Sequence, residues 1–355
     1  MPRHNKVAHG DFRDFTDDGG DMHLIRVGSR LLCATAMCVV ATSQTYAQDY
    51  GVNDEGPGPF NVTNPEGQVI EGAKSGIYSD GSSLSVDNAG VIRGNGSYDG
   101  FDAAPDGGIV FAGGPADIDN SGTISGQRFG ITTAYFFNPQ TNQLEPRAIG
   151  STVSNSGSII GDTDDGVRLI GGGSINNSGT IEGRVGQFAD GVSMFAFEGQ
   201  ANAGSTTIGS VTNLAGGTIL GNRFGIILSG GGTVDNAGTI GGNVGSVVIQ
   251  AQPTEAGRTG SLTNSGTLNG YVGFVNLATA SLGNSGAING PVVFGNVGSA
   301  TVTNSGSVAS SSSAGMDSDS ALVLTNEATG TISGSTSGIY SDGSSLSVDN
   351  AGVIR

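Results

Sequence analysis

The chain has 355 residues, including 64 glycines, 10 prolines and no tryptophan, and only 13% of its residues are charged. Glycine costs about 0.8–1 kcal/mol per interior helical position relative to alanine, so this composition argues against a helical protein. The combined glycine and proline content lies below that of low-complexity disordered chains, and the net charge of −17 argues against nucleic acid or an anionic membrane as a partner. We therefore expect an ordered, almost entirely β-sheet protein.

Residues 22–47 have the pattern of a secretory signal peptide. An apolar run at 31–42 follows Arg26 and Arg30 and precedes the small-x-small sequence that ends at Ala47. The run is shorter than the roughly 20 apolar residues of a transmembrane helix. We expect a helical Sec leader that is cleaved after Ala47, followed by an exported mature chain.

The remaining segments divide around this leader. Residues 11–21 contain five aspartates, the wrong sign for the start of a leader, so we interpret residues 1–21 as an upstream extension from a mis-assigned start codon. Residues 48–60 are expected to be a linker or N-terminal cap. Residues 61–355 are expected to form one array of repeats.

All cysteines and histidines precede the predicted cleavage point. They are Cys33, Cys38, His4, His9 and His23. The mature chain therefore lacks disulfides, thiol nucleophiles, the usual zinc ligands and any Ser-His-Asp triad. We expect no metal and no cofactor.

A short phrase, Asn-(Ser/Ala)-Gly-x-(Ile/Val/Leu), repeats along the mature chain. Most of its intervals are 20 to 24 residues, a period that is typical of a solenoid. Apolar and small polar residues alternate within each repeat, which predicts short strands. The expected fold is a parallel β-helix of roughly twelve coils. The asparagines of the phrase are Asn88, Asn120, Asn155, Asn177, Asn236, Asn264, Asn284, Asn304 and Asn350, with looser copies at Asn64, Asn213 and Asn326.

Each position of the phrase has an expected structural role. Stacked asparagine amides can form a hydrogen-bonded ladder along one turn of the coil. The glycine of the phrase is expected at a turn with positive φ. Aliphatic residues of successive coils are expected to form an interior column that contains Ile124, Ile159, Ile181, Ile219, Ile240 and Ile288.

Three long intervals open at Asn88, Asn120 and Asn177, and their extra residues are expected to leave the coil as loops. The loops contain most of the aromatic residues of the mature chain, which makes them candidates for binding glycan or protein. The alternative is that Phe111, Phe188 and others face inward. The candidate binding residues are Tyr98, Phe101, Tyr135, Phe136, Phe137, Phe195 and Phe197.

Acidic and basic residues give no clear catalytic pattern. The segment Asp162–Gly166 and the pair Asp317 and Asp319 lack the spacing of an EF-hand, so we interpret them as solvated turns. A polysaccharide lyase or hydrolase would use carboxylates with an arginine. The sequence places its candidate arginines singly in separate coils, and they are Arg128, Arg168, Arg184 and Arg223.

The recurring Asn-Ser-Gly-Thr-Ile at 120–124 and 177–181, followed by Gly-Ile or Gly-Val pairs, resembles the passenger region of bacterial autotransporters. The resemblance implies a right-handed β-helix, displayed on a Gram-negative cell and used for adhesion or aggregation. It also implies a C-terminal outer-membrane barrel of the same protein. This chain contains no such segment, and residues 337–355 repeat residues 75–93 letter for letter, so we expect an incomplete passenger with its barrel encoded downstream.

The sequence thus predicts a non-enzymatic, adhesin-like surface protein. Its expected partner is a glycan or protein on a host or bacterial surface, and its expected location is the cell surface, the outer membrane or the extracellular space. Two alternatives stay open. The first is that the chain is an inert spacer for an absent module, and the second is that it is a secreted β-helix that cleaves polysaccharide.

Overall fold

The computed structural model describes residues 37–40, 49–54, 56, 58–96, 106–134, 136–138, 143–145, 148–195, 209–252, 257–342 and 345–355. All of these residues belong to one unit, Thr35–Arg355. The expected signal helix lies almost entirely outside the described residues, and the four that are described form strand β1, which pairs with β3. No helix in the described part of the chain has the length and apolar character needed to cross a bilayer.

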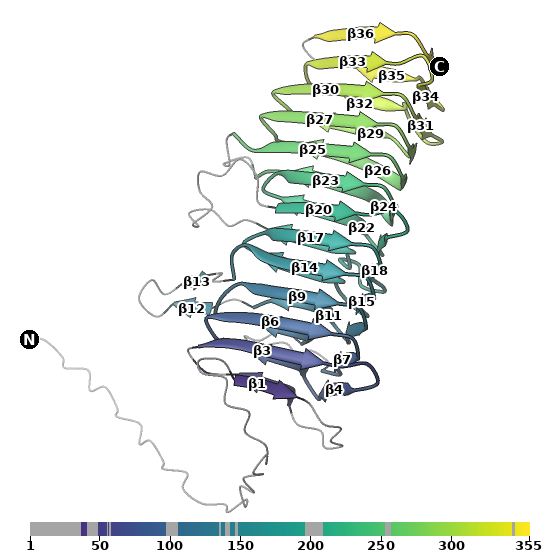
Figure 1. Cartoon of the computed structure of the whole chain (residues 1–355). Helices are drawn as coiled ribbons and strands as arrows, with labels where there is room; N and C mark the ends of the chain where they lie inside the picture. Colours follow the sequence, from purple (N-terminus) through teal and green to yellow (C-terminus); the bar gives the residue numbers. More distant parts are fainter. Residues whose placement is uncertain are drawn as a thin grey trace, which may run out of the picture. The chain divides into compact units, whose positions relative to one another are not determined.

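The described chain is an all-β parallel solenoid of about eleven turns, which confirms the expected fold class. Figure 1 shows the strands of successive turns stacked in chain order from purple to yellow. One side of the stack is a 13-stranded parallel sheet, here called sheet A. Its strands are β1 (Met37–Val40), β3 (Pro59–Asn64), β6 (Ser83–Asn88), β9 (Ala116–Asn120), β14 (Ser151–Asn155), β17 (Gly173–Asn177), β20 (Gly209–Asn213), β23 (Gly232–Asn236), β25 (Thr259–Asn264), β27 (Thr279–Asn284), β30 (Ser299–Asn304), β33 (Leu322–Asn326) and β36 (Leu346–Asn350).

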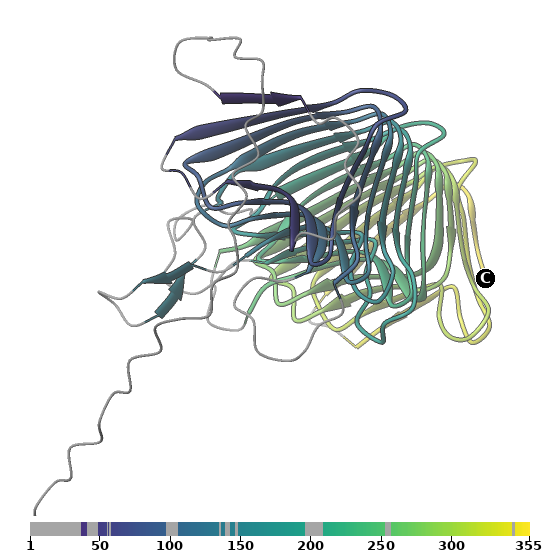
Figure 2. The ribbon, with the colours of Figure 1, turned by 90° about the horizontal axis from the view of Figure 1, so that it is seen from below.

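The other sides form a 22-stranded sheet, sheet B, which folds into two legs. The first leg follows each sheet A strand and contains β4 (Val69–Gly72), β7 (Val91–Gly94), β10 (Thr123–Gly126), β15 (Ser158–Gly161), β18 (Thr180–Gly183), β21 (Thr218–Gly221), β28 (Ala287–Asn289), β31 (Ser307–Ser310), β34 (Thr331–Gly334) and β37 (Val353–Ile354). The second leg contains β2 (Tyr50–Asp54), β5 (Ser75–Ser79), β8 (Gly107–Phe111), β11 (Phe129–Thr133), β16 (Val167–Ile170), β19 (Val192–Phe195), β22 (Phe224–Ser229), β29 (Val292–Gly295), β32 (Met316–Ser318) and β35 (Ile339–Ser341). Two long strands, β24 (Thr239–Gln250) and β26 (Thr267–Val275), run through both legs. In Figure 2 the strands of successive turns run side by side in the same direction.

The interior is one continuous aliphatic core. The residues that alternate along each strand point inward and outward in turn, so that most coils contribute four or more apolar side chains to the core. Ile124 pairs with Ile159, Ile159 with Ile181, and Ile181 with Ile219. This column continues through Ile240 and Leu268 to Ile288, and all of these side chains are fully buried. The predicted column is therefore present, with Leu268 as an additional member.

The glycine that follows each Asn-Ser or Asn-Ala pair has a role other than the expected one. None of these glycines is among the described residues with positive φ. A Cβ atom on Gly122 would instead lie 2.1 Å from the carbonyl oxygen of Gly90, and one on Gly266 would lie 2.1 Å from that of Gly238. The expectation of positive φ was wrong. Glycine is needed because each turn stacks directly on the backbone of the turn before it.

Insertions stand at two places in the order of the strands. In sequence, residues 95–106 and 184–191 separate a first-leg strand of sheet B from a second-leg strand, whereas 134–150 and 196–208 separate sheet B from the next strand of sheet A. Within 134–150, strands β12 (Phe136–Asn138) and β13 (Gln143–Glu145) form an antiparallel hairpin.

Candidate functional site

The predicted aromatic binding residues fall mostly outside the described residues. This is the case for Tyr98, Phe101, Tyr135 and Phe197, and only the backbone of Phe136 and Phe137 is described. Phe195 is half-buried at the end of β19, beside Ile170 and Ser229 of the adjacent coils. The aromatic binding patch therefore stays a prediction.

The inward-facing alternative is correct for one of its two named residues. Phe111 is 1% exposed and belongs to the core, whereas Phe188 is 58% exposed. Phe188 lies on the loop between the legs of sheet B, and the guanidinium carbon of Arg223 is 5.5 Å from the centre of its ring.

The asparagines of the repeat form a continuous ladder from Asn64 to Asn350. At each step Nδ2 donates to Oδ1 of the asparagine in the next coil, as from Asn88 to Asn120 at 2.7 Å. The second acceptor is the carbonyl oxygen of a glycine shortly after the asparagine in sequence, as from Asn120 Nδ2 to Gly122 at 3.3 Å. Every member except Asn350 is buried. Buried amides that satisfy one another in this way define the turn after sheet A. The ladder bonds join Asn64, Asn88, Asn120, Asn155, Asn177, Asn213, Asn236, Asn264, Asn284, Asn304, Asn326 and Asn350.

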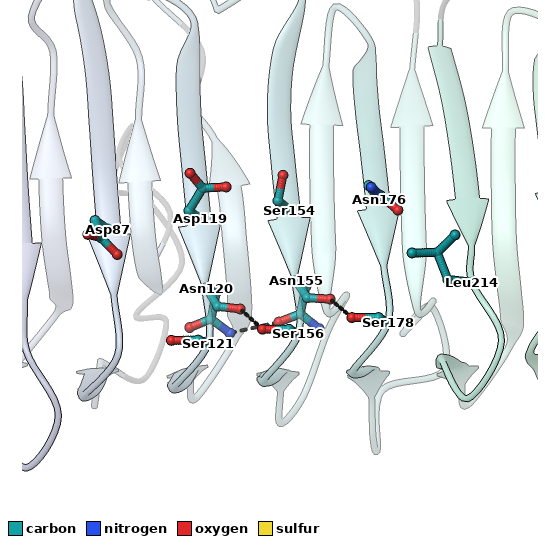
Figure 3. Close-up of a pocket in the computed structure, with 10 residues that line it drawn as sticks. All are labelled: Asp87, Asp119, Asn120, Ser121, Ser154, Asn155, Ser156, Asn176, Ser178 and Leu214. Carbon is teal, nitrogen blue, oxygen red and sulfur yellow. Dashed lines mark hydrogen bonds between the residues drawn. The ribbon is translucent and has the colours of Figure 1, made fainter.

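The outer face of sheet A, formed by the outward residues one and three positions before each ladder asparagine, is almost uniformly small and polar. Fifteen of its 24 side chains are serine or threonine, five are aspartate, and none is lysine or arginine. Part of this face forms a shallow hollow of about 190 Å³. Figure 3 shows Asp87, Asp119, Ser154 and Asn176 in one row across neighbouring strands, with the exposed Leu214 at the end of the hollow.

The structure also brings together ionic residues that are scattered in the sequence. We call this cluster the charged corner, and it lies between the two legs of sheet B. Arg168 donates from Nη2 to Asp164 Oδ1 at 2.8 Å and from Nε to Asp165 Oδ2 at 2.6 Å. Arg128, one coil earlier, lies 3.2 Å from the other oxygen of Asp164. The cluster consists of Arg128, Asp164, Asp165, Arg168, Asp190 and Arg223.

Aromatic rings support the arginines of the charged corner. The guanidinium carbons of Arg128 and Arg168 lie 4.7 and 4.3 Å from the centre of the buried Phe129 ring. Arg223 lies 5.1 Å from the ring centre of Phe224. Such contacts are attractive because the face of an aromatic ring is electron-rich. They hold the guanidinium groups at the corner between the two legs of sheet B.

Arg223 and Asp190 form the second half of the charged corner. Two nitrogens of the Arg223 guanidinium donate to the Asp190 carboxylate, Nη2 at 2.5 Å and Nε at 3.0 Å. The backbone amide of Phe224 donates to the same carboxylate at 3.0 Å. Asp190 is fully buried, and its backbone amide donates to Asp165 Oδ1 at 2.8 Å. The bidentate ion pair therefore joins the coil that contains Arg223 to the preceding coil, which contains Asp190.

Asp165 is the most perturbed carboxyl group of the charged corner. Burial raises its pKa to about 6, against the opposing attraction of Arg168, and the neighbouring carboxylates of Asp164 and Asp190 raise it further. Burial also raises the pKa of Asp190. The interpretation of Asp162–Gly166 as a solvated turn was thus wrong for Asp165, which has no exposed surface. Its carboxylate accepts hydrogen bonds from Arg168, Ser193 and the amide of Asp190.

This arrangement has consequences for chemistry. A catalytic carboxylate must reach a substrate, whereas Asp165 and Asp190 are enclosed and already bonded on both oxygens. Among the described residues there is no group of three or more acidic, histidine or cysteine side chains suited to a metal ion. The charged corner can bind successive coils to each other. The outer face of sheet A can instead offer hydroxyl, amide and carboxylate groups to an external partner.

No protein-family model, no curated protein and no solved structure matches this chain.

Proposed function

We propose that the chain is the exported, surface-displayed passenger of a bacterial autotransporter, and that it contacts other cells or surfaces without catalysing a reaction. The proposal takes the leader from residues 22–47, and the passenger type from the repeat that the chain shares in style with such proteins. It places the protein outside a Gram-negative cell, with a downstream barrel of the same protein as its anchor.

The outer face of sheet A carries this proposal. It presents two rows of small polar groups on a rigid support, with strands about 4.8 Å apart. The small side chains leave no bulky obstacle to a partner, and their hydroxyl and carboxylate groups donate and accept hydrogen bonds. Such a face suits a repeated, low-affinity contact over a long surface, in which many weak interactions act together.

The charged corner supports a non-enzymatic role. The pKa values of two of its carboxyl groups, Asp165 and Asp190, are raised, and perturbed groups are ordinarily the first candidates for catalysis. Here the perturbation comes from burial between coils. We therefore assign Asp165 and Asp190 to the stability of the solenoid.

Surface labelling tests the proposal. Antibody against the purified repeats should label intact producing cells, and deletion of the gene should lower the attachment of these cells to one another or to a host-cell layer. Labelling that requires permeabilised cells would contradict surface display.

Charge reversal on sheet A separates an adhesin from an inert spacer. The double variant Asp87→Lys/Asp119→Lys changes two exposed side chains of the outer face. An adhesin should lose a large part of its attachment, because the local charge of its contact face is inverted. Unchanged attachment at equal surface level would favour the spacer.

A further inference from the structure

A groove follows the outside of the corner between the two legs of sheet B, beginning in the last coils of the charged corner and continuing into the coils after it. It consists of two hollows, of about 370 and 510 Å³. Residues 243 and 244 are divided between the two hollows, as are 269 and 270, so the hollows adjoin. The groove crosses the coils from Glu182 to Ser312, nearly parallel to the axis along which the coils stack.

The floor of the groove is open because glycines, which have no side chain, form part of its lining. Gly241, Gly242, Gly270 and Gly290 line it. Strand β26 shifts register against β24 between Gly241 and Gly245, where both strands pass the corner without a loop. In the earlier coils this corner is filled by arginine and aspartate side chains, whereas here it is hollow.

The groove contains exposed apolar side chains. Val244 is 59% exposed and lines one hollow together with Phe224 and Tyr271, whereas Leu220 is 37% exposed and lines the other hollow. Tyr271 is half-buried, and burial raises the pKa of its hydroxyl. Exposed apolar groups gathered in a concave site are typical of ligand-binding surfaces.

Asparagine amides also line the groove. Asn243 Nδ2 donates to Asn222 Oδ1 at 2.8 Å, and Asn289 Nδ2 donates to Asn269 Oδ1 at 2.9 Å. Within the described residues, Asn243 Oδ1, Asn269 Nδ2 and Asn289 Oδ1 have no further partner. The groove therefore offers about one free amide donor or acceptor per coil, at a spacing of about 4.8 Å.

The charge of the groove limits its ligand. Its only ionic side chains are Glu182 and Arg184, which pair with each other at 2.8 Å, and Arg184 also pairs with Asp162 at 3.2 Å. An anionic ligand would find no unpaired cation and would meet a strongly acidic protein. A cationic ligand would find no unpaired carboxylate.

From this geometry we propose that the groove binds a neutral polysaccharide chain that lies along the solenoid axis. A sugar ring has an apolar C–H face, which packs on Tyr271 and Val244, and a hydroxyl edge, which bonds to the row of asparagine amides. Successive sugars of the polymer lie against successive coils of the protein, so several sugars are bound in the same way. This inference rests on the proposed function, since it names the class of surface partner.

Affinity electrophoresis of the full chain tests the proposal. The gels contain galactomannan, mannan or hydroxyethyl cellulose as neutral polymers, polygalacturonate as an acidic polymer, or no polymer. We expect retardation by at least one neutral polymer and none by polygalacturonate. The double variant Val244→Ser/Asn269→Ala should raise the dissociation constant at least tenfold.

A matched pair of variants makes the result specific. Val69 on β4 is 45% exposed and lies outside both the groove and the outer face of sheet A, so Val69→Ser is the control and should bind as the wild type does. Circular dichroism checks that each variant keeps its β-sheet. If the double variant loses this signal, the single Val244→Ser variant replaces it, with an expected loss of at least threefold.

Three results would overturn the proposal. They are the absence of retardation by every neutral polymer, an equal loss of binding in the Val244 and Val69 variants, or binding to the acidic polymer alone. Attachment of cells that display the groove variant reports separately on the proposed function. If the chain binds no neutral polymer but antibody-labelled cells attach normally, the groove proposal is wrong and the adhesin proposal stands. If antibody does not label intact cells, the adhesin proposal itself is wrong.

Discussion

At the scale of single residues, the asparagine ladder combines burial with pairing at every step after Asn64, whose buried Oδ1 has no partner among the described residues. In each buried asparagine an amide leaves water, which is costly unless its donors and acceptors are satisfied. Asn177 solves this by accepting from Asn155 and donating to Asn213, both at 2.8 Å. All donors point towards the C-terminal coils, so the side-chain dipoles are aligned and strengthen one another.

We predict that Asn177→Ala destabilises the protein by about 2–4 kcal/mol, because it removes one acceptor of Asn155 Nδ2 and leaves the buried Oδ1 of Asn213 without its donor. Asn350→Ala removes an exposed member with one ladder bond and should cost less than about 1 kcal/mol. Urea unfolding followed by circular dichroism measures both values. Equal losses would show that the ladder bonds contribute no more in the interior than at the surface.

The sequence predicts the ladder residues because the period of the phrase equals one coil. It does not predict the reason for the glycines, since a close approach between turns depends on how coils stack. Gly122 and Gly266 show this, because the atoms that exclude a Cβ belong to residues about one coil earlier in the chain.

At the scale of elements, the corner between the legs of sheet B changes character along the solenoid. It is ionic near β11, β16, β19 and β22 and becomes an open groove from β24 onwards. Separate coils supply the two sides of half of the described ion pairs, as for Arg128 with Asp164 and Arg223 with Asp190. Loops of unequal length separate these coils in sequence, so spacing alone does not reveal the pairs.

A signal for the charged corner nevertheless exists in the sequence. The segment Arg-Phe-Gly-Ile occurs at 128–131 and again at 223–226, and Asp-Gly-Val occurs at 165–167 and 190–192. Aligning the chain on the Gly-Ile and Gly-Val pairs places these arginines and aspartates at the same corner. The ladder phrase does not align these arginines and aspartates, because the number of residues between the phrase and this corner differs from coil to coil.

Asp165 makes the stability of the corner depend on pH. The ordinary aspartate pKa is about 3.9, whereas burial raises that of Asp165 to about 6. Between these values the folded chain holds the proton more tightly than the unfolded chain, so the free energy of unfolding falls as the pH rises. A difference of about two pH units corresponds to about 3 kcal/mol.

We predict that the wild type loses about 2–3 kcal/mol relative to Asp165→Asn between pH 4 and pH 7. The neutral amide of the variant does not titrate, so the difference between the two proteins isolates this carboxyl group. Chemical unfolding at each pH gives the two curves. A wild type that instead gains stability relative to the variant over this range would show that the pairing with Arg168 outweighs burial.

At the scale of the whole molecule, most of the stability comes from stacking. A single coil buries too few aliphatic side chains to offset its conformational entropy, so each coil depends on its neighbours. The chain provides an internal comparison, because residues 75–93 and 337–355 are identical. Leu84 is 2% exposed in the first copy, whereas its counterpart Leu346 is 46% exposed in the second.

We predict that Leu84→Ala costs about 2–5 kcal/mol, as for a buried leucine, and that Leu346→Ala costs less than about 1 kcal/mol. Local sequence is the same at both sites, so the contrast measures stacking alone. Urea unfolding of the two variants provides the test. Equal costs would mean that intrinsic strand preference, and not stacking, determines the stability of a coil.

The fold class follows from the period and the alternation of the repeat, and the structure confirms it. The exit points of the loops and the groove do not follow, because they depend on which corner receives each insertion. Val244 and Tyr271, for example, have no distinctive spacing in the sequence. They become neighbours because β24 and β26 pass the corner without a loop.

The two identical segments also occupy equivalent places in the winding, with Val86 and Val348 both at the inward position two residues before a ladder asparagine. Homologous recombination between the corresponding stretches of the gene would excise everything between them and rejoin the reading frame at the same point of the coil. The shortened product would keep its inside and outside faces unchanged. A coil that ends in one segment can therefore be followed by the coil that comes after the other, with the inward and outward positions in the same register.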